Sequence, residues 1–204
     1  VFKSYNGGQT WQSVLMPGFP QDTSALPSQG ANSPLRNCVK GSSSAADRCT
    51  SAADPVVRAG THGMLYYSGI AFNRGDSAAG KVFVARFIDD NNKDGGDPIQ
   101  YLGAAQIDLG TSGQFLDKPW IIADIPRGGS TCTINGRSVP AGPVYLVYTS
   151  FVGGDNNVHS KIMFSKSADC GATWSTPAKL SEGVAKNQGT TIAVDPGTGD
   201  IHLA

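Results

Sequence analysis

Short apolar runs separated by clusters of Gly, Pro, Asn and Asp dominate the chain. The runs MLYYSGIAF, KVFVARFI and PVYLVYTSF have the length of β-strands and are rich in β-branched and aromatic residues. The 26 glycines and 12 prolines supply turns between such runs. Because no long stretch repeats its apolar residues with a helical period, the pattern predicts an all-β fold.

The pattern also repeats at long range. Segments that begin DPVVRAG, DKPWIIAD and NQGTTIAV each have a polar start, a short apolar strand, a turn containing Gly and a second apolar strand. Pro55 and Pro119 are 64 residues apart, and Pro119 and Gly189 are 70 residues apart. This period is typical of the four-stranded antiparallel blades of a β-propeller with long loops.

Within a blade we name the strands A to D from the inside outward. One blade is predicted with strands at 55–59, 64–72, 81–88 and about 99–108, and the next at 119–124, 143–151, 159–166 and 174–180. The single propeller domain 1–204 then divides into the end of one blade (1–16), an inserted loop (17–53), two blades (54–116 and 117–186) and the start of another (187–204). We expect the chain to be a piece of a longer protein, with about three blades here and the remainder of its own propeller as a partner.

Two segments share Ser, Asp or Asn, Gly, Thr and Trp at the same spacing. We name them the first motif turn (Ser4, Asn6, Gly8, Thr10, Trp11) and the second motif turn (Ser167, Asp169, Gly171, Thr173, Trp174). Ser and Asp side chains bond nearby backbone N–H groups, Gly accepts a positive φ angle, and Trp anchors the following strand. Both segments fall between strands C and D, so a structural role is expected for both.

The order of the strands also predicts how the cysteines pair. Antiparallel order places the A–B connections and the C–D turns at one end of each blade. Cys132 in an A–B connection and Cys170 in the second motif turn then lie at the same end of one blade, so a Cys132–Cys170 disulfide is expected. A Cys38–Cys49 disulfide would hold the inserted loop. Disulfides indicate an oxidising compartment, and four buried free thiols are the alternative.

Charge and hydropathy exclude some partners. Sixteen basic and sixteen acidic residues cancel and no basic cluster is present, which argues against nucleic acid and anionic membrane surfaces. No apolar run is long enough to span a membrane, so membrane insertion is not expected. A secreted, extracellular or cell-surface location agrees with these features and with the cysteines.

The second motif turn, SADCGATW, resembles the Asp-box of the sialidase superfamily, and the first, SYNGGQTW, has Asn in place of Asp. DKPWIIAD and QGTTIAVDPGTGDI are similar to inner strands of bacterial sialidase-like BNR-repeat proteins. The resemblance covers essentially the whole chain and implies a sialidase-type propeller with six blades when complete. In that family the Asp-boxes lie on the face away from the active site and are specific for architecture rather than activity.

The resemblance implies a secreted sialidase-like glycoside hydrolase that acts on terminal sugars of glycans or glycoproteins. Two alternatives stay open: a non-catalytic Asp-box propeller that binds glycan or protein at the cell surface, and a structural module of a larger extracellular enzyme. Sialidases use three arginines, a Tyr assisted by Glu, and an Asp acid/base. The Arg-Ile-Pro signature of the family is missing, since DIPRGG has these letters in another order.

The loops opposite the motif turns would carry the chemistry. Asp54, Asp117 and Glu182 are the candidate catalytic carboxylates, because glycoside hydrolysis needs an acid and a second carboxylate. The candidate substrate-binding residues at the same end are Arg74, Lys118, Asp155, His159 and Gln188, with Asp76 beside them. Structural alternatives stay open: Asp54 and Asp117 can cap a loop or bind the neighbouring blade's backbone, and Glu182 can be solvated surface. Arg58, inside a predicted A strand, either faces the propeller axis or, as we expect, forms a salt bridge at the core edge.

The segment DDNNKDGGD contains a candidate calcium loop. Carboxylate and amide oxygens that suit calcium occur at Asp90, Asn92, Asp94 and Asp97. Tyr101 stands where an EF-hand would need Glu, which excludes an EF-hand. A shorter structural calcium loop and a plain polar hairpin turn are the two interpretations. No other cofactor is expected.

Overall fold

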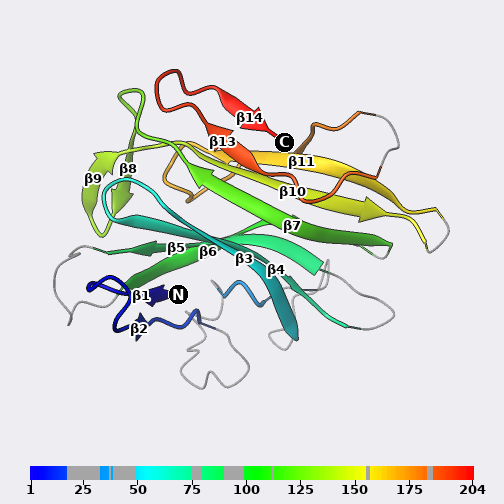
Figure 1. Ribbon diagram of the computed structural model, residues 1–204, viewed down its shortest axis with the longest axis horizontal. Helices are drawn as coiled ribbons and strands as arrows, with labels where there is room; N and C mark the ends of the chain where they lie inside the picture. The colour runs from blue at the N-terminus through cyan, green and yellow to red at the C-terminus, as the bar shows by residue number, and fades with distance from the viewer. Residues whose placement is uncertain are drawn as a thin grey trace.

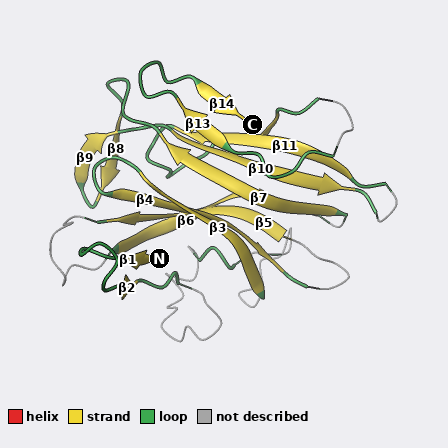
Figure 2. Cartoon of the chain, in the orientation of Figure 1, coloured by secondary structure: helices red, strands yellow, loops and turns green. Residues whose placement is uncertain are grey.

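The computed structural model describes residues 1–17, 33–36, 38, 49–74, 80–89, 99–111, 113–154, 157–182 and 186–204. Strands, turns and loops make up all of these residues (Figure 2). The all-β prediction is therefore confirmed for the described part of the chain. That part contains no helix capable of spanning a membrane.

Four consecutive strands form the first sheet, in which each strand pairs antiparallel with the next. They are β3 (Ser51–Ala59), β4 (Met64–Phe72), β5 (Gly80–Ile88) and β6 (Gln100–Leu109). The last three lie within one residue of the predicted strands, because turn residues bound their apolar runs. β3 begins at residue 51, earlier than the predicted strand 55–59.

The second sheet has the same antiparallel order. Its strands are β7 (Gln114–Ala123), β10 (Val144–Val152), β11 (His159–Ser167) and β12 (Ala178–Lys179). β10 and β11 agree with prediction within one residue, whereas β12 has two residues instead of the predicted 174–180. Thr173 and Trp174 are instead bonded within the second motif turn, and Pro177 has no N–H group for pairing.

An additional hairpin lies between β7 and β10. β8 (Thr131–Ile134) and β9 (Arg137–Pro140) are joined by Asn135 and Gly136, which have positive φ angles of 50° and 77°. Asn-Gly favours such two-residue turns, yet the sequence prediction treated this region as one long connection. The hairpin carries Cys132 towards the second motif turn.

β3 and β7 both continue through a β-bulge near their first residues. The pairing register shifts in both strands. Asp54 and Lys118 occupy the bulges with left-handed φ angles of 53° and 51°. Each precedes a proline, which has no N–H group to donate to a neighbouring strand. Both positions are therefore typical of loops in the sequence, although the strands continue through them. Asp54 and Asp117 therefore lie inside β3 and β7 rather than before them.

The sheets stack face to face as layers (Figure 1). The hairpin of β1 (Phe2–Lys3) and β2 (Gln12–Ser13) covers one face of the first sheet, and the second sheet covers the other. The hairpin of β13 (Ile192–Val194) and β14 (Ile201–Leu203) follows beside β7. Between the two four-stranded sheets lies the main core, with Val84, Leu146 and Tyr148 at its centre. The described strands form a stack and no closed ring or barrel.

The two motif turns use the same hydrogen bonds. In the second turn, the Ser167 hydroxyl accepts from Gly171 N at 2.9 Å, and the Asp169 carboxylate accepts from Thr173 N at 2.9 Å. Trp174 Nε1 donates to Gly171 O at 3.1 Å. The first turn repeats these bonds at 2.8, 2.9 and 3.0 Å between the corresponding residues. The polar groups of the motif are thus used inside the turn, as expected for a structural element.

The four cysteines form two disulfides, Cys38–Cys49 and Cys132–Cys170. Both pairs were expected, Cys132–Cys170 from the order of the strands and Cys38–Cys49 as a local bridge of the inserted loop. The second disulfide links β8 to the second motif turn across a Cα–Cα distance of 6.1 Å. Because disulfides persist in oxidising compartments, both bonds are compatible with an extracellular protein.

Arg127 joins the end of β7 to the β13–β14 turn. Its guanidinium donates to Asp124 Oδ2 at 2.6 Å and to the backbone oxygens of Asp195 and Pro196 at 2.9 and 3.0 Å. Asp124 is buried, so its charge is held by a partner rather than by water. The arginine of the DIPRGG segment therefore holds successive layers together.

Candidate functional site

The first strands of three layers bring equivalent residues to one cleft. Asp54 in β3, Lys118 in β7 and Gly189 before β13 all have left-handed φ angles, of 53°, 51° and 77°. The cleft has a volume of about 240 Å³, and its other lining residues are Pro55, Val56, Pro119, Trp120 and Thr190. β3, β7 and the segment before β13 thus each contribute a left-handed residue and the one or two residues that follow it. A left-handed backbone is uncommon for Asp and Lys, and strain of this kind often occurs at binding sites.

Asp54 links the two sheets through Lys118. Asp54 Oδ2 lies 3.1 Å from Lys118 Nζ and accepts a longer hydrogen bond of 3.4 Å from Lys118 N. The ammonium group also lies 3.9 Å from Asp117 Oδ1. Three residues predicted for the site therefore meet in one cluster. Asp54 also binds the backbone of the neighbouring sheet, which is the structural role that the sequence left open for it.

The two carboxyl groups of this cluster differ in proton affinity. Burial raises the pKa of Asp117, and a hydrogen bond with Asp54 raises it further, against the lowering effect of the Lys118 charge. Burial acts on the pKa of Asp54 in the same direction, but the hydrogen bonds of Asp54 with Asp117 and Lys118 outweigh burial and lower this pKa. Of the two carboxyl groups, Asp117 is therefore the one whose proton affinity is raised.

Trp120 supplies an aromatic surface to the cleft. The guanidinium of Arg58, from β3, lies 4.9 Å from the centroid of the Trp120 ring and donates to Val57 O at 2.9 Å. This cation–π contact holds the ring at the boundary between β3 and β7. Among the described residues, Arg58 forms this aromatic contact and not the expected salt bridge, because β7 places Trp120 beside it.

The remaining predicted residues lie at the same ends of the strands as the cleft. Arg74 follows β4, and its guanidinium lies 6.0 Å from the centroid of the Phe72 ring. His159 begins β11 and is half-buried. Gln188 is exposed and directly precedes Gly189 of the cleft. Glu182 is exposed and is not among the described residues that line the cleft.

Two other predictions fall on residues that the structure does not describe. One concerns the substrate-face residues Asp76 and Asp155, and the other concerns the calcium ligands Asp90, Asn92, Asp94 and Asp97. Within the described ranges, no group of three or more His, Cys, Asp or Glu side chains is arranged to hold a metal ion. The calcium loop therefore stays a prediction.

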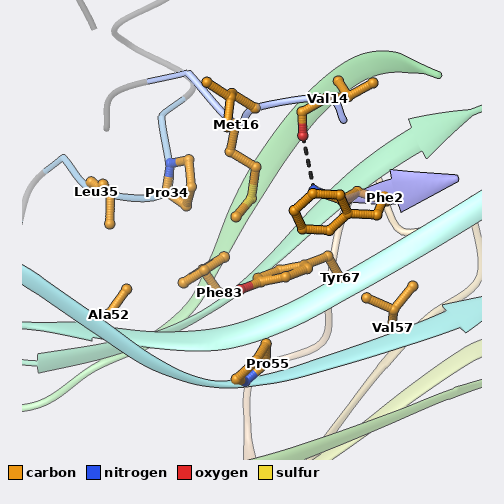
Figure 3. A pocket seen from close by; sticks show the side chains of 12 residues that line it. Phe2, Val14, Met16, Pro34, Leu35, Ala52, Pro55, Val57, Tyr67 and Phe83 are labelled. Atoms are coloured by element: carbon orange, nitrogen blue, oxygen red, sulfur yellow. Dashed lines mark hydrogen bonds between the residues drawn. The ribbon is translucent and has the colours of Figure 1, made fainter. Parts of the chain in front are cut away.

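A larger groove, of about 580 Å³, lies between the N-terminal hairpin and the first sheet (Figure 3). Phe2 and Met16 lie on one side of it, and Val57, Tyr67 and Phe83 lie on the other. The side chains that line the groove are apolar or aromatic, with no carboxylate, histidine or cation among them. Because recognition sites combine apolar surface with a few placed polar groups, the smaller cleft is the better candidate.

The sequence did not identify Trp120, Pro119 or Thr190 as site residues. They read as ordinary members of inner strands, which is the common role of such residues. The signal that would have found them is the alignment of DPVV, KPWI and GTTI, in which the cleft residues fall at the same offsets.

Comparison of the chain with protein-family models gives no match, and comparison with curated proteins gives no significant similarity. The likeness to the sialidase superfamily is therefore carried by the motif turns and inner strands alone. Function is inferred from these motifs and from the cleft.

Proposed function

We propose that this chain is part of a secreted, sialidase-like β-propeller whose cleft binds a sugar residue of a glycan or glycoprotein without hydrolysing it. The observation that carries the proposal is the pairing of Asp54 and Lys118 beside the Trp120 ring in one small cleft. Sugars present hydroxyl groups, which pair with carboxylate and ammonium groups, and apolar C–H faces, which pack on aromatic rings. A cleft that offers both surfaces suits a single sugar ring.

Three features support the propeller part of the proposal. Each four-stranded sheet consists of consecutive antiparallel strands, and the two sheets stack face to face. The left-handed residues recur at the same point of successive inner strands, as in blades arranged around an axis. The apolar groove, bordered by the exposed side chains of Phe2 and Val57, suits a surface that further blades would cover.

The spacing of the carboxyl groups favours binding over hydrolysis. Asp54 and Asp117 lie around one ammonium group, with carboxylate oxygens 3.1 and 3.9 Å from Lys118 Nζ. Retaining glycosidases hold their two carboxyl groups about 5–5.5 Å apart and inverting glycosidases about 6.5–9.5 Å apart, because the sugar or a water molecule must react between them. Two carboxyl groups that are both drawn to one lysine suit ion pairing and hydrogen bonding rather than reaction with a sugar placed between them.

A second candidate function, sialidase-like hydrolysis of terminal sugars, is favoured by one observation. The pKa of Asp117 is raised and that of Asp54 is lowered, and glycosidases use such a difference to keep one carboxyl protonated beside an ionised one. In this alternative Asp117 would protonate the glycosidic oxygen, after the ligand had separated it from Asp54.

Glycan-array binding tests the main proposal. Trp120→Ala should weaken binding by about tenfold, because the ring supplies the apolar contact. Trp11→Ala is the matched control, since Trp11 is 62% exposed in the first motif turn and does not line the cleft. Circular dichroism of each variant checks that it is folded. Equal weakening by both substitutions, or no glycan bound by folded wild-type protein, would contradict the proposal.

Fluorogenic glycosides, including a sialoside, separate the two candidate functions. Binding without turnover is the expected result. If the wild-type protein hydrolyses a glycoside, and Asp117→Asn abolishes hydrolysis while binding persists, the hydrolase becomes the supported function.

A further inference from the structure

Among the described residues that line the cleft, the positive charge is already paired with carboxylates. Lys118 is the one cation among the described residues that line it, and its ammonium lies 3.1 Å from Asp54 and 3.9 Å from Asp117. With both carboxyls ionised the cluster of three groups has a net charge of about minus one, and with one shared proton about zero. A carboxylate that entered the cleft would therefore meet two acidic side chains around an ammonium group that is already shared.

Two arginines of the first sheet contact aromatic rings and do not line the cleft themselves. Arg58 lies over the Trp120 ring and donates to Val57 O. Arg74, which follows β4, lies 6.0 Å from the centroid of the Phe72 ring. Recognition of a carboxylate typically uses the planar fork of a guanidinium, which presents two parallel N–H groups. None of the described residues that line the cleft is an arginine, so this mode of recognition is missing there.

The rest of the lining suits an uncharged ring. Pro55, Val56, Pro119 and Trp120 provide apolar surface, and Thr190 provides a hydroxyl group. Asp54 keeps acceptor capacity besides its bonds to Lys118, because a carboxylate has about four lone-pair positions. Gly189 has open space where a side chain would stand, which leaves room on the third side of the cleft. Hydroxyl groups of a sugar can use these polar positions while its C–H face packs on the apolar ones.

We propose that the cleft selects a neutral sugar, such as a hexose or an N-acetylhexosamine, and discriminates against sugars that carry a carboxylate. This inference rests on the proposed sugar-binding function and adds the chemical class of the sugar. It departs from the acidic sugar that likeness to sialidases would imply, because the charge of this cleft favours a neutral ring.

Matched pairs of ligands isolate the effect of charge. The methyl glycosides of glucose, galactose and mannose are each compared with the corresponding methyl uronide, and the methyl glycoside of N-acetylneuraminic acid is added. Isothermal titration of the full chain should show at least one neutral glycoside binding about tenfold more tightly than its uronide. Tighter binding of a uronide or of the sialoside, with loss in Trp120→Ala, would overturn the inference and leave sugar binding intact. Binding of none of these sugars or of any arrayed glycan would remove the proposed function and the inference together.

Asp54→Asn tests whether charge is the cause. Removing this carboxylate leaves Lys118 less neutralised, so the preference for the neutral member of a pair should fall by about tenfold. Asp169→Asn is the matched control, because Asp169 lies in the second motif turn and the first motif turn has Asn at the corresponding position. An unchanged preference in Asp54→Asn would refute the electrostatic explanation, and so would an equal change in Asp169→Asn.

Discussion

Asp169→Ala should destabilise the protein through the second motif turn. The carboxylate of Asp169 accepts hydrogen bonds from Thr173 N at 2.9 Å, from Thr173 Oγ1 at 2.6 Å and from Ser167 Oγ at 2.8 Å. Alanine removes all three acceptor contacts at once. The turn also contains Cys170 of the Cys132–Cys170 disulfide, so the loss affects a point where β8 and β11 are connected.

The size of the effect follows from the number of bonds lost. A hydrogen bond contributes about 0.5–1.5 kcal/mol net, so three would contribute about 1.5–4.5 kcal/mol if they were buried. Thr173 is exposed, and water can replace part of what its groups lose. We expect a loss of about 2 kcal/mol in the free energy of unfolding, which lowers Tm by about 4–8 °C in a chain of this length.

Asp169→Asn provides the control for this prediction. Asn6 occupies the same position in the first motif turn, where its Oδ1 accepts from Thr10 N at 2.9 Å and its Nδ2 donates to Thr10 Oγ1 at 2.9 Å. Asn at 169 can form the same bonds, so it should cost less than about 1 kcal/mol. Calorimetry and urea unfolding of the three proteins measure the difference. Equal losses for Ala and Asn, or no loss for Ala, would refute the account of the turn.

The stabilising effect of Asp169 should also depend on pH. Burial acts to raise the pKa of Asp169, but hydrogen bonds from Thr173 and Ser167 outweigh it and lower the pKa. A group whose pKa is lower in the folded state stabilises the protein above its unfolded pKa, and this contribution is lost as the pH falls through the folded value. The stability advantage of wild type over Asp169→Asn should therefore be full near neutral pH and shrink below about pH 4.

Three further predictions concern other parts of the fold. Gly171→Ala should lower Tm more than the matched Gly8→Ala. A Cβ at position 171 would lie 2.9 Å from a tyrosine ring carbon, whereas a Cβ at position 8 would lie 3.6 Å from its nearest neighbour. Equal shifts in Tm would contradict the packing of the second motif turn. Replacing Cys132 and Cys170 by Ser should lower the free energy of unfolding by up to about 4 kcal/mol, since the disulfide closes a loop of 38 residues. An unchanged midpoint of urea unfolding would argue against this contribution. The apolar groove should bind the dye ANS, and Val57→Ser should weaken its fluorescence severalfold; unchanged fluorescence would place the dye elsewhere.

The strands that could be predicted are those with continuous apolar runs between turn residues. β4, β5 and β10 are of this kind, and each is buried over much of its length. The starts of β3 and β7 could not be placed, because Asp54, Lys118 and the prolines after them are loop signals in isolation. Pairing with β4 and β10 continues β3 and β7 through their bulges. This pairing is a tertiary effect, which the local preferences of the residues do not include.

The shared face of the polar residues in the cleft could be predicted from strand order, whereas their direct contact and the aromatic residue beside them could not. Asp54, Asp117 and Lys118 were expected on one face because they lie near corresponding ends of β3 and β7. Trp120 has the pattern of a core residue, and only the contact between β3 and β7 places its ring beside Arg58 and in the cleft. Cys132–Cys170 could be predicted because strand order brings its two loops to the same end, and Cys38–Cys49 because the two cysteines are only 11 residues apart in one connection.

The indole N–H signals of the three tryptophans test the central claim most directly. Trp120 lines the cleft, Trp11 lies in the first motif turn, and Trp174 lines a separate groove beside β6. Titration of ¹⁵N-labelled protein with the neutral methyl glycosides should shift the Trp120 signal and leave the other two in place. A shift confined to Trp174 or Trp11, or no shift of Trp120 at saturating sugar, would contradict sugar binding in the cleft.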